Sequence, residues 1–249
     1  MPMLSTERQQ TIARLVAEHG AVDVADLAVR LAVSGSTIRR DLERLERDGL
    51  VRRVHGGATV PGGMRPLQAD RSRAAERMGR AAANRVRSDE TVYLGPGEYS
   101  LEVAKALSGR PGVTVVTNSL DISHWLAHHS NLKVVVTGGA VNRSQGALFG
   151  PLVSAALASV RTDRVIVEAV GITPDQGIVA DDLSQAAVCR DLMEVTGESI
   201  VLVPPDRVGK PGGVWVGPAS DADVVVTTRE APGSLLWDLS QMGIDIVTV

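Results

Sequence analysis

Hydroxyl and guanidinium side chains gather in one short segment near the start of the chain. Ser34, Ser36 and Thr37 are followed closely by Arg39 and Arg40. Hydroxyls and the amides of a helix N-terminus bind phosphate oxygens, and the planar fork of an arginine matches O6 and N7 of guanine. The segment therefore suits duplex DNA if a helix presents these side chains on one surface.

Three helices that share one core are expected to position this segment. They are predicted over residues 7–19, after a cap at Asp23, and from a cap at Ser34 or Ser36 to about Asp48. The hydrophobic periodicity predicts that the following side chains face the core: Ile12, Leu15, Val16, Leu27, Leu31, Ile38, Leu42 and Leu45. Only about four residues separate the last two helices, which is typical of a helix-turn-helix whose second helix enters the major groove.

The apolar positions of the third helix also decide which side chains face outward. The contacts expected from this helix to DNA are those of Ser34, Ser36, Thr37, Arg39, Arg40 and Arg44. Acidic residues, among them Asp41, balance the arginines along the helix, so contacts should concentrate at its N-terminal end. Residues 50–54 and 58–60 are expected to form a hairpin that turns at Gly56-Gly57. This wing would add DNA contacts from Arg52, Arg53 and His55.

Length and composition exclude several classes of protein. The chain has 249 residues, of which 44% are hydrophobic and 22% charged, so it can bury one large core or two smaller ones. One Phe, 2 Tyr and 3 Trp are too few for the base-stacking platforms of many single-strand binders. The single cysteine, Cys189, excludes an internal disulfide or a multi-cysteine zinc site. No apolar run has the roughly 18 to 20 residues that cross a bilayer, and no signal peptide is evident, so we expect a cytoplasmic protein with no membrane partner.

Charge and turn residues divide the chain near Pro61. Residues 1–60 carry nine arginines and eight acidic residues, which gives them a formal charge of +1. Residues 61–249 carry a formal charge of −4, and the two parts add up to the total of −3. The stretch from residue 56 to 69 holds four glycines and two prolines without hydrophobic periodicity. We predict a winged helix-turn-helix over 1–60, a linker over 61–75 and an effector-sensing domain over 76–249. A helix rich in Ala and Arg is expected over about residues 70–87.

The remainder of the chain alternates short apolar runs with helical stretches. The apolar runs include TVYLG, TVVTNS, LKVVVTGG, RVIVEAVGI, SIVLVP, ADVVVTT and IDIVTV. This pattern predicts an α/β domain with a mostly parallel sheet covered on both faces. Because such sheets bind ligands at the carboxyl ends of their strands, four loops there are candidates for an effector site. The candidate residues are Gly95, Gly97, Glu98, Tyr99, Ser100, Thr117, Asn118, Ser119, Gly138, Gly139, Asp206, Arg207 and Lys210.

The run VDVADLAVRLAVSGSTIRRDLERLERDGLVRRVHGGA resembles, nearly position for position, the winged helix-turn-helix of the DeoR family of bacterial transcriptional regulators. The segments TVVTNSL, VVTGG and RTDRVIVEAVGITPDQGI are similar to the sensor domain of that family, a fold related to ribose-5-phosphate isomerase. Together the two matches span nearly the whole chain. The resemblance implies a repressor of sugar or carbon metabolism genes that binds an operator and responds to a phosphorylated sugar or a similar metabolite.

Two loops depart from the family pattern. The family has Asp-x-Gly-Thr-Thr where this chain has Gly95-Pro96-Gly97-Glu98-Tyr99, and Asp-x-Ser-Lys where it has Pro204-Pro205-Asp206-Arg207. A carboxylate at Glu98 would repel a phosphate. We therefore hypothesise an effector that is neutral, cationic or differently oriented, with Glu98 accepting hydrogen bonds from hydroxyls or an amine. A sensor that has lost its ligand response is the other hypothesis.

Other function classes have weaker support. Glu168, Asp181 or Asp182 could act as a base in a sugar-phosphate isomerase with an accessory DNA-binding module, although an isomerase needs no winged helix. A ligand-independent DNA-binding protein is a further interpretation. His124 and His128 have a spacing that suits a metal on a helix, but no third ligand is evident. We expect no catalytic activity, cofactor or metal, and a homo-oligomer that binds repeated half-sites of double-stranded DNA.

Overall fold

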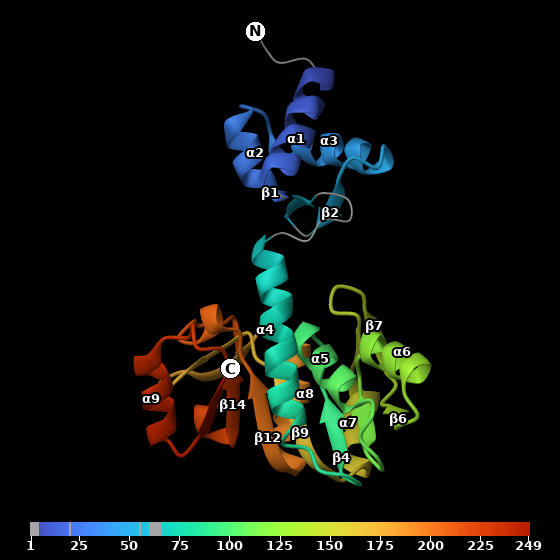
Figure 1. Ribbon diagram of the computed structural model, residues 1–249, viewed down its shortest axis with the longest axis vertical. Coiled ribbons are helices and arrows are strands. Elements are labelled where there is room, and N and C mark those ends of the chain that lie inside the picture. Colours follow the sequence, from blue (N-terminus) through green and yellow to red (C-terminus); the bar gives the residue numbers. More distant parts are fainter. Residues whose placement is uncertain (1–4, 20, 55, 60–65) are drawn as a thin grey trace. The chain divides into compact units, whose positions relative to one another are not determined.

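The computed structural model describes residues 5–19, 21–54, 56–59 and 66–249 (Figure 1). The chain forms two compact units, Met1–Ser72 and Arg73–Val249, and helix α4 (Pro66–Ala83) contains the boundary between them. The predicted linker over 61–75 is therefore helical from Pro66 onward, where its described part begins. Proline suits the first turn of a helix because its φ is already helical and its missing N–H needs no partner there.

The first unit contains short helices and strands. They are α1 (Ser5–His19), β1 (Ala21–Asp23), α2 (Val24–Arg30), α3 (Gly35–Arg47), β2 (Arg52–Val54) and β3 (Gly57–Thr59). Two side-chain caps start helices as predicted, because Ala25 N donates to Asp23 Oδ1 over 2.6 Å and Thr37 N donates to Ser34 Oγ over 3.3 Å. The helices enclose a core of Ile12, Val16, Val24, Leu27, Ile38, Leu42, Leu45, Val51 and Ala58.

The three strands of this unit form an antiparallel sheet in the order β1-β3-β2. Strands β2 and β3 are the two arms of the expected wing, and β1 was not predicted. Gly57 is required where β3 meets β1, because a Cβ at this position would lie 2.0 Å from the carbonyl oxygen of Val22. Gly56 turns the hairpin with a φ of +85°. His55, a predicted DNA contact, lies outside the described residues.

A seven-stranded parallel sheet forms the centre of the second unit. Its strands are β4 (Thr91–Leu94), β5 (Thr114–Thr117), β6 (Lys133–Val136), β9 (Thr162–Glu168), β12 (Thr196–Leu202), β14 (Val224–Thr227) and β15 (Asp245–Thr248). Their order is β15-β14-β12-β9-β4-β5-β6, and every neighbouring pair is parallel. The predicted parallel sheet is confirmed.

Helices cover both faces of this sheet (Figure 1). One face packs against α4, α5 (Glu98–Leu107) and α6 (Leu120–His129), and the other against α7 (Pro151–Ser159), α8 (Leu183–Val195) and α9 (Gly233–Gln241). Neighbouring strand residues alternate between the two cores: Ile166 lies with Met78 and Val103, whereas Val165 lies with Leu192. Each face therefore contributes its own apolar layer.

Short strands and turns lie outside the central sheet. They comprise the hairpin β7 (Ala140–Asn142) and β8 (Ala147–Phe149), the antiparallel strands β10 (Gly171–Thr173), β11 (Gly177–Ala180) and β13 (Val214–Gly217), and the 3-10 turns η1 (Pro205–Arg207) and η2 (Ala219–Asp221). In the central sheet, β5 and β6 extend from β4 to one side, and β12, β14 and β15 extend from β9 to the other. A ligand site is thus expected where β4 and β9 end. Within the described residues, no helix is long and apolar enough to cross a membrane.

Candidate functional site

Hydroxyl groups cluster at the N-terminus of α3. Ser34 Oγ lies 2.8 Å from Ser36 Oγ and 2.9 Å from Thr37 Oγ1. Ser34 and Ser36 are exposed and Thr37 is half-buried. The first amides of a helix lack partners within the helix, and its N-terminus carries partial positive charge. This end of α3 can therefore donate hydrogen bonds to a phosphate.

The arginines expected to contact DNA divide into two groups. Arg39, Arg40 and Arg44 are exposed on α3, and no ion pair joins any of them to another part of the chain that the structure describes. Arg53 on the wing instead donates from Nη1 to Glu43 Oε1 over 3.0 Å. Its guanidinium therefore links the wing to α3. Arg52 lies in the same wing strand, β2.

Asp41 has a role that sequence reasoning missed. It was expected as one of the acidic residues that balance the arginines of α3, but it is only 4% exposed and faces α1. Arg8 Nε donates to Asp41 Oδ2 over 2.6 Å, and Gln9 Nε2 donates to Asp41 Oδ1 over 2.9 Å. These contacts fix the rotation of α3 relative to α1, and with it the direction in which the exposed arginines point.

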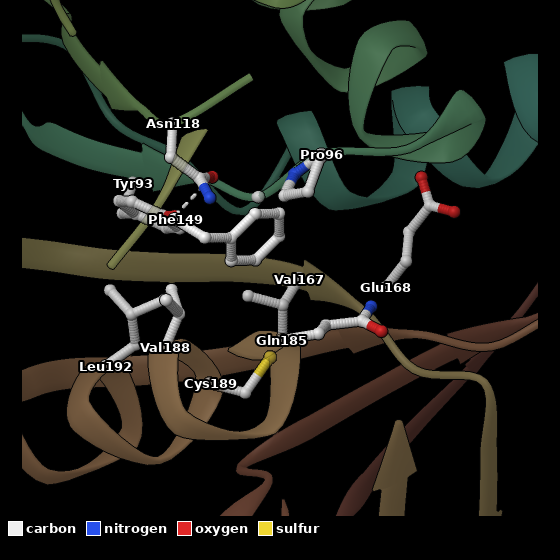
Figure 2. A pocket seen from close by; sticks show the side chains of 11 residues that line it. Tyr93, Pro96, Asn118, Phe149, Val167, Glu168, Gln185, Val188, Cys189 and Leu192 are labelled. Atoms are coloured by element: carbon white, nitrogen blue, oxygen red, sulfur yellow. Dashed lines mark hydrogen bonds between the residues drawn. The ribbon is translucent and has the colours of Figure 1, made fainter. Parts of the chain in front are cut away.

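The second unit has a pocket at the carboxyl ends of β4, β5 and β9, beside α8 (Figure 2). The pocket itself is small, with a cavity volume of about 10 Å³, and the empty space of about 270 Å³ around it includes open solvent. The lining residues are Tyr93, Gly95, Pro96, Asn118, Phe149, Val167, Glu168, Gln185, Val188, Cys189 and Leu192. The pocket lies beside the point where the direction of the sheet connections reverses, as expected for a ligand site. Of the predicted effector residues, Gly95 and Asn118 are in this lining.

Glu168 is the acidic residue of this lining. It ends β9, and its Oε1 accepts a hydrogen bond from Ser100 N over 2.8 Å. Burial raises the pKa of the Glu168 carboxyl to about 7, and the negative charge of Glu98 adds to this effect. Amide hydrogen bonds from Ser100 and Tyr99 oppose the rise in its pKa. The carboxyl therefore changes its charge close to neutral pH.

Several predicted effector residues use their polar atoms inside the protein. Tyr93 Oη donates to Asn118 Oδ1 over 2.6 Å, and Asn118 Nδ2 donates to the carbonyl of Leu148 over 2.8 Å. Thr117 Oγ1 donates to the carbonyl of Leu94, and Ser119 Oγ caps α6. The polar segment after β5 is thus tied to β4, to β8 and to the start of α6.

The other candidates lie at the same edge of the sheet but outside the pocket lining. Glu98 is exposed at the start of α5, whereas Tyr99 and Ser100 are buried. Gly97 precedes α5, and Gly138 and Gly139 follow β6. Asp206, Arg207 and Lys210 are exposed in and after η1, where Gly209 N donates to the carbonyl of Ile172 over 2.8 Å. This late loop therefore packs along β10.

Neither a metal centre nor a reactive thiol is evident in the described residues. No group of three His, Cys, Asp or Glu side chains there could hold a metal ion. The Nδ1 of His128 lies 2.8 Å from the carbonyl oxygen of His124, so this ring contacts its own helix. Burial raises the pKa of the Cys189 thiol to about 12, which keeps it protonated.

A winged helix-turn-helix together with an α/β unit in one chain is typical of a transcriptional regulator. The chain matches the DeoR-like helix-turn-helix domain over residues 8–62 and the DeoR C terminal sensor domain over residues 71–229. It belongs to the DeoR family of transcriptional regulators.

The chain is also similar to individual regulators and to one solved structure. The chain is 31% identical over 239 residues to the HTH-type transcriptional regulator YgbI of Escherichia coli K12, with 93% of each chain covered. It is 25% identical over 245 residues to the HTH-type transcriptional repressor CsqR of the same strain, with 96% of this chain and 94% of that one covered. The full-length sorbitol operon regulator SorC from Klebsiella pneumoniae is similar with a TM-score of 0.40 and 13% identity, over 93% of this chain and 97% of that chain.

Proposed function

We propose that this protein is a transcriptional repressor that binds an operator in duplex DNA through α3 and responds to a small metabolite in its strand-end pocket. The observation that carries the proposal is the set of exposed arginines on α3, Arg39, Arg40 and Arg44, beside a cluster of hydroxyls. An exposed guanidinium without an acidic partner is available to DNA. The relative CsqR is a repressor, which supports this direction of control.

Each group of residues has its own part in this proposal. Ser34, Ser36 and Thr37 bind phosphate oxygens together with the first amides of α3, which sets the position of the helix on the duplex. Arg40 and Arg44 lie one turn apart and reach base edges in the major groove. A wing that carries Arg52 and His55 adds backbone contacts. One such domain reads a short site, so a homo-oligomer on repeated half-sites supplies the specificity.

The pocket of the second unit is the proposed effector site. Its lining is concave and mostly apolar, with the polar side chains of Asn118, Glu168 and Gln185 among the walls, as in small-molecule sites generally. We propose that this site binds a metabolite of sugar or carbon metabolism without converting it. The effector changes DNA affinity if it binds one conformation of the protein more tightly than another.

Selection of genomic DNA by the full-length protein tests this function. Fragments that survive competition with bulk DNA should share one repeated sequence next to a small set of genes. Deletion of the gene for this protein should raise their transcription, and a plasmid copy should restore repression. If no shared sequence is selected, operator binding is wrong. If deletion lowers transcription, the protein is an activator and the repressor proposal is wrong.

A further inference from the structure

The N-terminus of α5 already has a negatively charged partner from within the protein. Ser100 N, in the first turn of α5, donates to Glu168 Oε1 over 2.8 Å. Gly97 is the N-cap residue and offers no side chain to cap the helix. Helix N-termini favour anions because their amides lack partners and their macrodipole is positive. The carboxyl of Glu168, from the end of β9, occupies the place that a bound anion would take.

The chain leaves space for this carboxyl at Gly97. A Cβ at Gly97 would lie 2.1 Å from Oε1 and Cδ of Glu168, and its φ of +141° is one that favours glycine. Any larger residue at position 97 would force the carboxyl away from α5. The turn between β4 and α5 is thus fitted to the protein's own carboxyl group.

We propose that Glu168 acts as an internal anion at the N-terminus of α5 and thereby determines which effectors the pocket accepts. While this carboxyl is ionised, a ligand with a phosphate or carboxylate at this end is excluded, and a neutral or cationic ligand with hydroxyl or amine donors is accepted. An ionised carboxyl only accepts hydrogen bonds, and it repels a second anion placed beside it. This proposal rests on the proposed role of the pocket as the effector site.

The rest of the lining fits the same class of ligand. Within the described residues, no lysine or arginine lines the pocket, so an anionic group there would lack a countercharge. Figure 2 shows Glu168 and Gln185 at one end of the pocket, and Tyr93 and Leu192 at the other. A ligand with an apolar side and donor groups at one end would match these walls.

Binding of sulfate tests the proposal, because this ion stays doubly charged across neutral pH. The full-length wild-type protein is compared at about pH 8 with Glu168→Ala and with Glu194→Ala, which removes an exposed acid from α8 as a matched change in net charge. Titrations are read from the amide resonances of Tyr99 and Ser100, with sodium chloride at equal ionic strength as the reference. We expect the affinity for sulfate to be at least about tenfold higher in Glu168→Ala than in the other two proteins.

Either of two results overturns the proposal. One is saturable sulfate binding at α5 by the wild type as tight as that of Glu168→Ala, and the other is a folded Glu168→Ala that gains no sulfate binding. If Glu168→Ala does not fold, pH and sulfate titrations of the wild-type protein test the proposal instead. Its Ser100 amide should shift as Glu168 titrates near pH 7 and should not respond to sulfate at about pH 8; a response there contradicts the proposal. Because no DNA is present, failure here is distinct from failure of operator binding.

Discussion

Arg8 of α1 and Asp41 of α3 form an ion pair inside the DNA-binding unit, with 2.6 Å between Arg8 Nε and Asp41 Oδ2. Both side chains are largely shielded from water, at 12% and 5% exposure. A charge pair in such surroundings is sensitive to the loss of either partner, because the remaining charge is left without compensation. The pair joins the helix that carries the candidate DNA contacts to the rest of its core.

Replacing Asp41 with Ala should lower the free energy of unfolding of this unit by about 3 kcal/mol, since it removes the buried carboxylate that accepts hydrogen bonds from both Arg8 and Gln9. Urea denaturation followed by circular dichroism measures this change. The matched control is Arg47→Ala on the same helix, at an exposed position, which should cost less than about 1 kcal/mol. Equal losses in the two variants would show that the buried pair has no special role.

Glu168 should make the stability of the sensor unit depend on pH. Its pKa in the folded protein is about 7, above the ordinary value of 4.5, so the folded state binds the proton more tightly than the unfolded state does. This contribution to stability is complete below about pH 4.5 and is lost as the pH rises through about 7. Replacing Glu168 with Gln removes the loss. As the pH is raised from acidic to mildly alkaline, the free energy of unfolding of the variant should rise by up to about 3 kcal/mol relative to that of the wild type.

Denaturant titrations of both proteins at a series of pH values measure this difference. Other groups titrate in the same range, so the informative quantity is the wild-type free energy of unfolding minus that of Glu168→Gln. A difference that stays constant from about pH 5 to about pH 8 would contradict the raised pKa of Glu168. Glu194→Gln, at an exposed position on α8, serves as the control and should follow the wild type.

Arg164 should be important for the stability of the central sheet. At the amino end of β9 its Nε lies 2.7 Å from Glu90 Oε2, and its guanidinium also pairs with Glu198. The hydrogen bond from Arg164 holds the pKa of Glu90 below its ordinary value. Arg164→Met should lower the free energy of unfolding by about 3 kcal/mol, because Glu90 loses its guanidinium partner and Glu198 keeps only its pair with Arg85. Arg80→Ala breaks an exposed pair with Glu76 and should cost less than about 1 kcal/mol in the same urea titration. If Arg164→Met and Arg80→Ala lowered the free energy of unfolding by similar amounts, the ion pairs of Arg164 would have no special importance for stability.

Much of the fold follows from local patterns in the sequence. Asp23 and Ser34 cap helices as predicted, since short polar side chains suit that position. The apolar runs that include Val92, Val115 and Val225 form central strands, because a strand buried on both faces is apolar throughout. Strand β1 and the hairpin β7–β8 were missed, since strands of three residues show no periodicity and depend on distant partners.

The sites were less predictable because they depend on contacts between distant segments. Asp41 follows Arg8 by 33 residues, and Glu168 follows Ser100 by 68. No spacing rule brings such pairs together. Glycine loops at the sheet edge indicated the region of the pocket. The sequence named Glu168 only as a possible base of an isomerase, and did not predict that its carboxyl accepts a hydrogen bond from the start of α5. Phe149 and Leu192 come from β8 and α8, and their apolar side chains look like ordinary core residues in the sequence.

Direct base reading by α3 is the central claim, and Arg40 tests it most directly. Fluorescence anisotropy should compare wild type, Arg40→Ala and the control Arg47→Ala on a selected operator and on scrambled DNA at one salt concentration. We predict that Arg40→Ala weakens operator binding by about 5- to 150-fold and binding to scrambled DNA by less than about threefold, while Arg47→Ala changes both little. Equal losses on the two DNAs in Arg40→Ala would contradict base reading by this helix.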